Sequence, residues 1–93
     1  MFHVVLRQSG PDFRAGEPLE SQSGWPEHAV FMDALAGEGF VVVGGPIGGG
    51  RVVHVVDAAS EGEIRARLAQ DPWFGSHLEI ESISAWEIRL GSL

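Results

Sequence analysis

Residues 40–57 read FVVVGGPIGGGRVVHVVD, and this segment decides the fold. Two runs of mostly β-branched residues, at 40–43 and 51–57, flank glycines and a proline, which is typical of a β-hairpin. The glycine-rich stretch at 44–50 invites comparison with a phosphate-binding loop, but it precedes a strand rather than a helix and lacks the lysine. The segment therefore predicts a hairpin and no nucleotide site.

The two runs of this hairpin carry apolar residues on both faces of the predicted sheet. A sheet with helices on one side and solvent on the other should alternate between apolar and polar residues. The valines that break this rule are Val41, Val42, Val43, Val52, Val53, Val55 and Val56. We therefore expect a second copy of the chain to cover the other face, which gives a two-fold homodimer through the sheet. The alternative is that valine is present only for its high β-propensity on a half-exposed sheet.

Two helices are predicted, one before the hairpin and one after it. The first covers residues 25–38, where the apolar spacing becomes helical and Pro26 suits a first turn. Its apolar stripe consists of Trp25, Ala29, Met32 and Ala36. The second covers residues 61–70 and begins with Ser60 and Glu63, which match a capping box.

Strands at both ends of the chain complete the pattern. They are predicted over residues 2–7 and, from alternating side chains, over residues 79–90. The order βαββαβ predicts an α+β fold, a ferredoxin-like sandwich with a four-stranded antiparallel sheet and two helices on one face. We interpret residues 1–93 as a single domain. The polar segment at 9–24 is predicted to be a loop, either a lid or binding segment or a mobile insertion.

Composition narrows the classes of partner. The net charge is −7, and the six basic residues are scattered, so neither nucleic acid nor an anionic membrane surface is expected as a partner. There is no cysteine, which excludes disulfides, thiolate metal sites and a cysteine nucleophile. No stretch has the length and apolar character of a signal peptide or a membrane span, and we expect a cytoplasmic protein.

Candidate chemistry centres on His28 and Asp71. On the first helix, His28 projects into the apolar arc, where an imidazole needs a polar partner. That partner could be a carboxylate, or a backbone carbonyl if the histidine is only structural. Asp71 precedes Pro72, and its carboxylate could orient a histidine for proton transfer, or it could simply cap a short turn.

Other constellations are weaker. His3 and His54 are expected on the two central strands, facing the same side, but no short-spaced set of ligands accompanies them and no metal site is predicted. The three tryptophans could wall an aromatic pocket or belong to the core. Ser21, Ser23 and Ser76 lack the context of a nucleophile elbow, so serine hydrolysis is not expected.

The chain resembles the YciI-like (YCII-related) family in three motifs. These are residues 26–32 (PEHAVFM), the pair Gly45-Pro46 at the end of the second strand, and residues 71–73 (DPW) before the last strand. The resemblance implies a dimeric ferredoxin-like fold and an active-site pair formed by His28 and Asp71. Some members are linked to the dehydrochlorination of chlorinated aromatic compounds, and many have no assigned reaction.

These patterns lead to a hypothesis of function. The chain is interpreted as an enzyme without a cofactor, in which His28 is the general base or acid and Asp71 positions it. A small molecule is expected to bind against Trp25, Gly45, Pro46 and Trp73, and to undergo proton abstraction, isomerisation or elimination. The alternatives are a dimeric binding module without turnover, and a cofactor-free oxygenase of the dimeric α+β barrel group, whose motifs are not found.

Overall fold

In the computed structural model, which describes residues 1–92, the four strands and two α-helices follow one another in the order predicted from the sequence. The elements are β1 (Phe2–Gln8), the short 3-10 helix η1 (Leu19–Ser21), α1 (Trp25–Gly37), β2 (Val41–Gly48), β3 (Arg51–Val56), α2 (Glu61–Leu68) and β4 (Leu78–Ala85). No helix within residues 1–92 combines the length and the apolar composition that crossing a bilayer requires.

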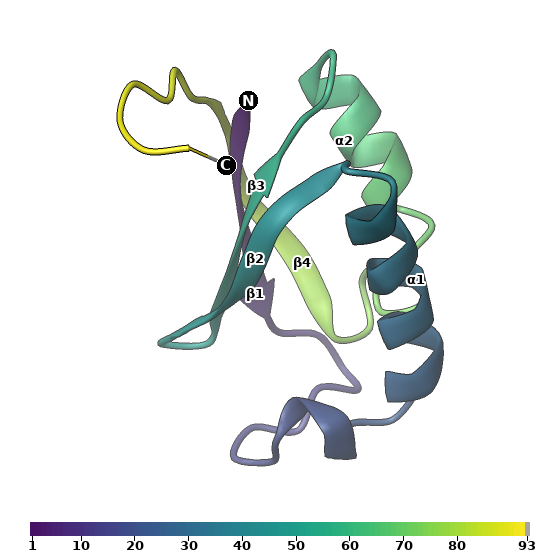
Figure 1. Cartoon of the computed structure of the whole chain (residues 1–93). Coiled ribbons are helices and arrows are strands. Elements are labelled where there is room, and N and C mark those ends of the chain that lie inside the picture. Colours follow the sequence, from purple (N-terminus) through teal and green to yellow (C-terminus); the bar gives the residue numbers. More distant parts are fainter. Residues whose placement is uncertain (93) are drawn as a thin grey trace.

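The four strands form one open antiparallel sheet in the order β2-β3-β1-β4. Both helices lie on the same face of this sheet, and the other face is left open (Figure 1). This arrangement confirms the predicted ferredoxin-like α+β fold. Dimerisation through the open face stays a prediction.

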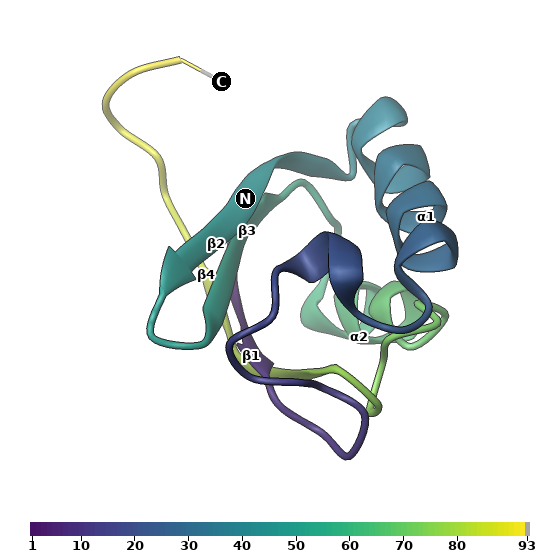
Figure 2. The same ribbon diagram turned by 90° about the horizontal axis from the view of Figure 1, so that it is seen from below.

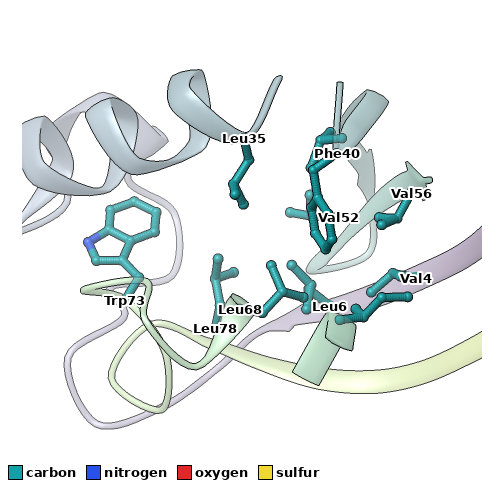
Figure 3. Packing of buried hydrophobic residues seen from close by; sticks show 11 residues of the cluster. Val4, Leu6, Leu35, Phe40, Val52, Val56, Leu68, Trp73 and Leu78 are labelled. Atoms are coloured by element: carbon teal, nitrogen blue, oxygen red, sulfur yellow. The ribbon is translucent and has the colours of Figure 1, made fainter. Parts of the chain in front are cut away.

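The hydrophobic core fills the space between the sheet and the helices. From the central strands, Val4, Leu6, Val52 and Val56 point toward the helices. They meet side chains from α1, α2, the segment before β4 and the first residue of β4, of which Leu35, Ile64, Leu68, Trp73 and Leu78 are buried. Figure 3 shows Trp73 below α1, at the end of this cluster opposite Val4 and Val56. The core therefore extends without interruption into the region that holds His28 and Asp71.

The first helix differs from its predicted stripe. The buried side chains of α1 are His28 and Leu35, whereas Ala36 is exposed. The face toward the sheet is therefore centred on the larger side chains, because a buried leucine removes more apolar surface from water than an alanine does. The predicted capping of the second helix is confirmed on one side, since the hydroxyl oxygen of Ser60 accepts a hydrogen bond from the Glu63 N–H at 3.1 Å.

The second strand is longer than predicted. β2 continues through Gly44, Gly45 and Pro46 to Gly48, and only Gly49 and Gly50 form the turn. Its pairing with β3 has two irregularities, and it lies at an edge of the sheet. A proline is tolerated there because an edge strand does not need every N–H for pairing.

The last strand departs from prediction at both its length and its alternation. It ends at Ala85, not at residue 90, because its only partner, β1, begins at Phe2 opposite Ala85. A bulge at Glu81, which has no partner on β1, places Ile80 opposite Leu6 and Ile83 opposite Val4, so that both isoleucines pack on the core. The alternation predicted for residues 79–90 would place these two isoleucines on opposite faces of the sheet.

Packing of α2 on the sheet gives a direct test of this core. Ile64 is fully buried, and Ile64→Ala is expected to lower the free energy of unfolding by about 2–5 kcal/mol through lost burial and the cavity left behind. Val30→Ala on the exposed face of α1 is the matched control, and we expect a change within about 0.5 kcal/mol. Urea unfolding of both variants measures the difference, and equal effects would contradict the assigned core.

Candidate functional site

His28 and Asp71 are in contact, although 43 positions separate them along the chain. His28 lies in the first turn of α1, and Asp71 lies in the turn that follows α2. The imidazole Nδ1 is 2.8 Å from the carboxylate Oδ1, and both residues are buried. The partner of His28 is therefore a carboxylate and not the backbone carbonyl of the structural alternative.

Asp71 also caps a turn, through the same oxygen. Its Oδ1 accepts a hydrogen bond from the Trp73 backbone N–H at 2.9 Å, so the carboxylate caps this turn in addition to its contact with His28, and its role in proton transfer stays a prediction. Because a backbone N–H can only donate, this oxygen acts as an acceptor, and the Nδ1 atom of His28 carries the proton between the two side chains. In the neutral imidazole, Nε2 then holds the free lone pair. Within residues 1–92, that atom has no hydrogen-bond partner.

Trp73 fixes the plane of the His28 ring. The indole stacks on the imidazole, with ring centroids 4.0 Å apart and planes inclined by 8°. Its Nε1–H donates to the Ser23 carbonyl at 2.8 Å, just before α1 begins. The segment that carries Asp71 thus holds the first turn of α1 at two points, and His28 has little freedom to rotate.

On its other face, Trp73 stacks on the buried His77, with centroids 4.6 Å apart. The hydroxyl of Ser23 lies 3.0 Å from His77 Nε2, and that of Ser76 lies 2.8 Å from His77 Nδ1. None of these three residues lines the cavity beside His28. We interpret the group as a support for Trp73.

The His28 ring borders a cavity of about 220 Å³ between α1, β2 and β3. All of the predicted pocket residues line it: Trp25, Gly45, Pro46 and Trp73. Four further apolar residues line the cavity and were not predicted to do so, namely Leu19, Met32, Val52 and Leu78. Asp71 is not part of the lining and supports His28 from behind. The structure brings the predicted residues together, and their role in binding stays a prediction.

Leu19 brings the loop at 9–24 into this cavity. Seen from below, η1 lies beside the start of α1, over the end of the space between sheet and helices (Figure 2). The buried side chain of Gln22 holds the loop closed: its Oε1 accepts from Arg14 N, and its Nε2 donates to the carbonyls of Arg14 and Glu17 at 2.7 and 3.2 Å. The segment therefore contributes Leu19 to the wall of the cavity, and its role in binding stays a prediction.

The expectation for His3 and His54 is wrong. In the register of β1 and β3, His54 is opposite Val4 and His3 is opposite Val55, so the two imidazoles lie on opposite faces of the sheet. Because both faces of β3 carry valine, the sequence pattern could not assign them. His54 faces the helices and lines the cavity with His28, whereas His3 stands edge-on to Trp86, with centroids 5.6 Å apart.

His54 is an uncompensated polar group. Its Nδ1 atom is buried and has no hydrogen-bond partner within the described residues. The pKa of His54 is lowered from 6.5 to about 4, mainly because the ring is buried; the nearby His28 contributes to the lowering, and the Asp71 carboxylate opposes it. His54 is therefore neutral near pH 7. Gly44 leaves the space that this ring occupies, since a β-carbon at that position would lie 2.4 Å from Nδ1.

Among residues 1–92, no three histidine, aspartate or glutamate side chains converge as a metal site would require. No protein-family model matches the chain, and no curated protein matches it.

The depressed pKa of His54 predicts a pH-dependent stability. Between about pH 6.5 and 4 the unfolded chain binds a proton at His54 that the folded chain does not, so stability falls as the pH falls through this window. The shift corresponds to about 3 kcal/mol. In His54→Leu, we expect the difference in unfolding free energy between pH 7 and pH 4.5, measured by urea titration, to be smaller by about this order.

At pH 7, His54→Leu should be no less stable than the original chain, because leucine leaves no buried polar atom without a partner. His3→Leu on the open face is the matched control, and its pH dependence should follow that of the unchanged protein. Parallel pH profiles for the original chain and His54→Leu would contradict the assignment.

Proposed function

We propose that the protein is an enzyme that needs no cofactor and catalyses proton transfer on a small, largely apolar molecule. The observation that carries this proposal is the His28–Asp71 hydrogen bond, which leaves Nε2 of His28 as the free proton acceptor beside a cavity. A general base requires such an acceptor within reach of the substrate, and a carboxylate behind it.

The His28–Asp71 pair can act first as a base and then as an acid. Nε2 takes a proton from the substrate, and the Asp71 carboxylate stabilises the resulting imidazolium across the 2.8 Å contact. Trp73 adds the negative face of its π system, stacked on the same ring. Returning the proton to the same atom, to a neighbouring atom or to a leaving group gives exchange, isomerisation or elimination. None of these reactions requires an electron carrier.

Cavity size limits the substrate. A volume of about 220 Å³ is below the range of about 300–1,000 Å³ that is usual for pockets of drug-sized ligands. The walls are mainly apolar, and two of them are the indoles of Trp25 and Trp73, inclined by 52°. A single-ring or short-chain molecule with an acidic C–H bond fits this description. The motif resemblance to the YciI-like family, with dehydrochlorination among its reactions, agrees with it, and the cytoplasmic location remains a prediction.

Removal of the base tests this proposal. We expect the protein to exchange protons for deuterium, or to release chloride, on members of a panel of small cyclic and aromatic carbonyl and chloro compounds in D₂O. His28→Gln should lower the rate by about 10²–10⁴-fold, without weakening binding, since glutamine retains polarity but not basicity. NMR of the compounds measures both exchange and binding.

His3→Gln is the matched control for that experiment, because it changes a histidine on the opposite face of the sheet. Turnover that survives in His28→Gln would remove His28 from the chemistry. Binding without turnover in the unchanged protein would favour the alternative of a dimeric binding module.

We also propose that the open face of the sheet is the interface of a homodimer. Val43 is exposed and Val53 is partly exposed on that face, where they lie beside the buried Val5 and Val55, opposite to the side that carries the helices. Trp86 follows β4 and contacts His3 edge-on, yet 44% of its surface stays exposed, which is a large apolar area. A second copy of the same face would cover both features at once.

A charge on this face should prevent association. Val43 is 52% exposed, so Val43→Asp leaves the folded chain intact but buries an unpaired carboxylate in the dimer. We expect a dimer for the original chain and a monomer for Val43→Asp, by light scattering at micromolar concentration. Val30→Asp, at a 71% exposed position on α1, is the control and should remain dimeric. A monomer in all three proteins would refute the interface.

A further inference from the structure

His54 is the one member of the cavity wall whose side chain has a stability cost that packing does not explain. A leucine would fill a similar volume without a buried polar atom, and a buried nitrogen without a partner is costly. The ring is held on β3, one of the two central strands, and Gly44 on β2 gives it room. Nδ1 lies against Gly44, away from the reach of a ligand, and Nε2 of the same ring has no hydrogen-bond partner within residues 1–92, so Nε2 is the atom that a ligand in the cavity can meet.

The buried position of one ring nitrogen determines where the proton of His54 resides. A neutral imidazole carries its proton on either Nδ1 or Nε2. A proton on Nδ1 would leave a buried donor without an acceptor, which native proteins rarely tolerate. The proton therefore resides on Nε2. That atom is not among the fully buried atoms that lack a partner, so the outer edge of the ring opens toward the cavity.

Two imidazoles of opposite character thus border one cavity. His28 comes from α1 and presents a lone pair at Nε2, because its Nδ1–H is used by Asp71. His54 comes from β3 and presents an N–H. Burial keeps the pKa of His54 at about 4, and the charged groups that act on it are His28 and Asp71. It therefore stays a neutral donor when His28 takes up a proton.

We propose that His54 is a second binding and catalytic group of this site, and that its Nε2–H donates a hydrogen bond to the carbonyl oxygen of the ligand. This inference rests on the acid/base function proposed above and assigns its substrate class: small carbonyl compounds with a C–H bond next to the carbonyl carbon. His28 Nε2 takes the proton, the C–H electron pair forms the carbon–carbon double bond of an enolate, and the oxygen that gains the negative charge accepts from His54. Return of the proton from His28 completes an exchange or an isomerisation with no net oxidation or reduction.

The test uses two probes of the same shape, acetophenone and α-methylstyrene, in which a methylene group replaces the carbonyl oxygen. Titration of the full chain followed by NMR should show that acetophenone binds about 2- to 10-fold more tightly, the effect of one neutral hydrogen bond. In His54→Leu the two affinities should become equal. His54→Gln, whose amide N–H reaches a similar position, should restore part of the preference.

A second measurement needs no ligand. The ¹⁵N chemical shifts of the imidazole should identify His54 at pH 7 as the neutral form protonated on Nε2, and addition of acetophenone should shift that resonance. A proton on Nδ1, equal affinities for the two probes in the unchanged chain, or an undiminished preference in His54→Leu would each overturn the inference.

The same experiments separate failure of the acid/base reaction from failure of the role assigned to His54. His28→Gln should keep the preference for acetophenone and lose exchange of its methyl protons with D₂O. A preference that depends on His54, without any exchange in the unchanged protein, would support His54 as the carbonyl-binding group and refute the acid/base reaction.

Discussion

One carboxylate oxygen, Oδ1 of Asp71, ties the site to the fold. It accepts from the His28 imidazole and from the Trp73 backbone N–H, at 2.8 and 2.9 Å. Since the two donors belong to different segments, the oxygen joins the turn after α2 to the first turn of α1. Stacking of Trp73 on His28 and the bond from its indole to the Ser23 carbonyl both depend on this junction. The position of the ring and the location of its proton are therefore set together by one atom.

The polar groups of this region are tolerated for different reasons. His28, Asp71 and His77 are buried with hydrogen-bond partners, so their burial costs little. His54 is buried with one nitrogen unpaired and resists protonation. A domain of this size has a free energy of unfolding of only about 5–14 kcal/mol, so an unpaired buried imidazole lowers its stability noticeably. Groups that lower the stability of the fold in this way are typical of binding and catalytic sites.

Local signals were sufficient to predict the order of the elements. The apolar runs at 40–43 and 51–57 and the Ser60 cap each act within a few residues, and the structure has the two strands and the capped helix in that order. Features that depend on a neighbouring strand were not predictable in this way. The end of β4 is set by where β1 begins, and the extended pairing of Gly44 and Gly45 is set by β3.

The candidate site shows the same limit. Contact between His28 and Asp71 followed from motif resemblance, because nothing local relates residues so far apart in the chain. His54 was predicted to lie on the same face of the sheet as His3, which is wrong. Because β3 carries valines on both sides, the alternation of its side chains does not show which face is polar. The hydrogen bonds from the Gln22 side chain to the loop backbone were not predicted either. A glutamine can bond to many backbone groups, and the sequence does not show which of them lie within its reach.

The bulge in β4 also affects how the chain meets other copies of itself. An open edge strand presents unpaired N–H and C=O groups to any extended segment, and this is the usual route to uncontrolled sheet growth. In β4 the extra residue, Glu81, interrupts the spacing of those groups, and its carboxylate accepts hydrogen bonds from the guanidinium groups of Arg7 and Arg51. A straight strand added at this edge would lose its register there. The irregularity therefore disfavours open-ended fibrils.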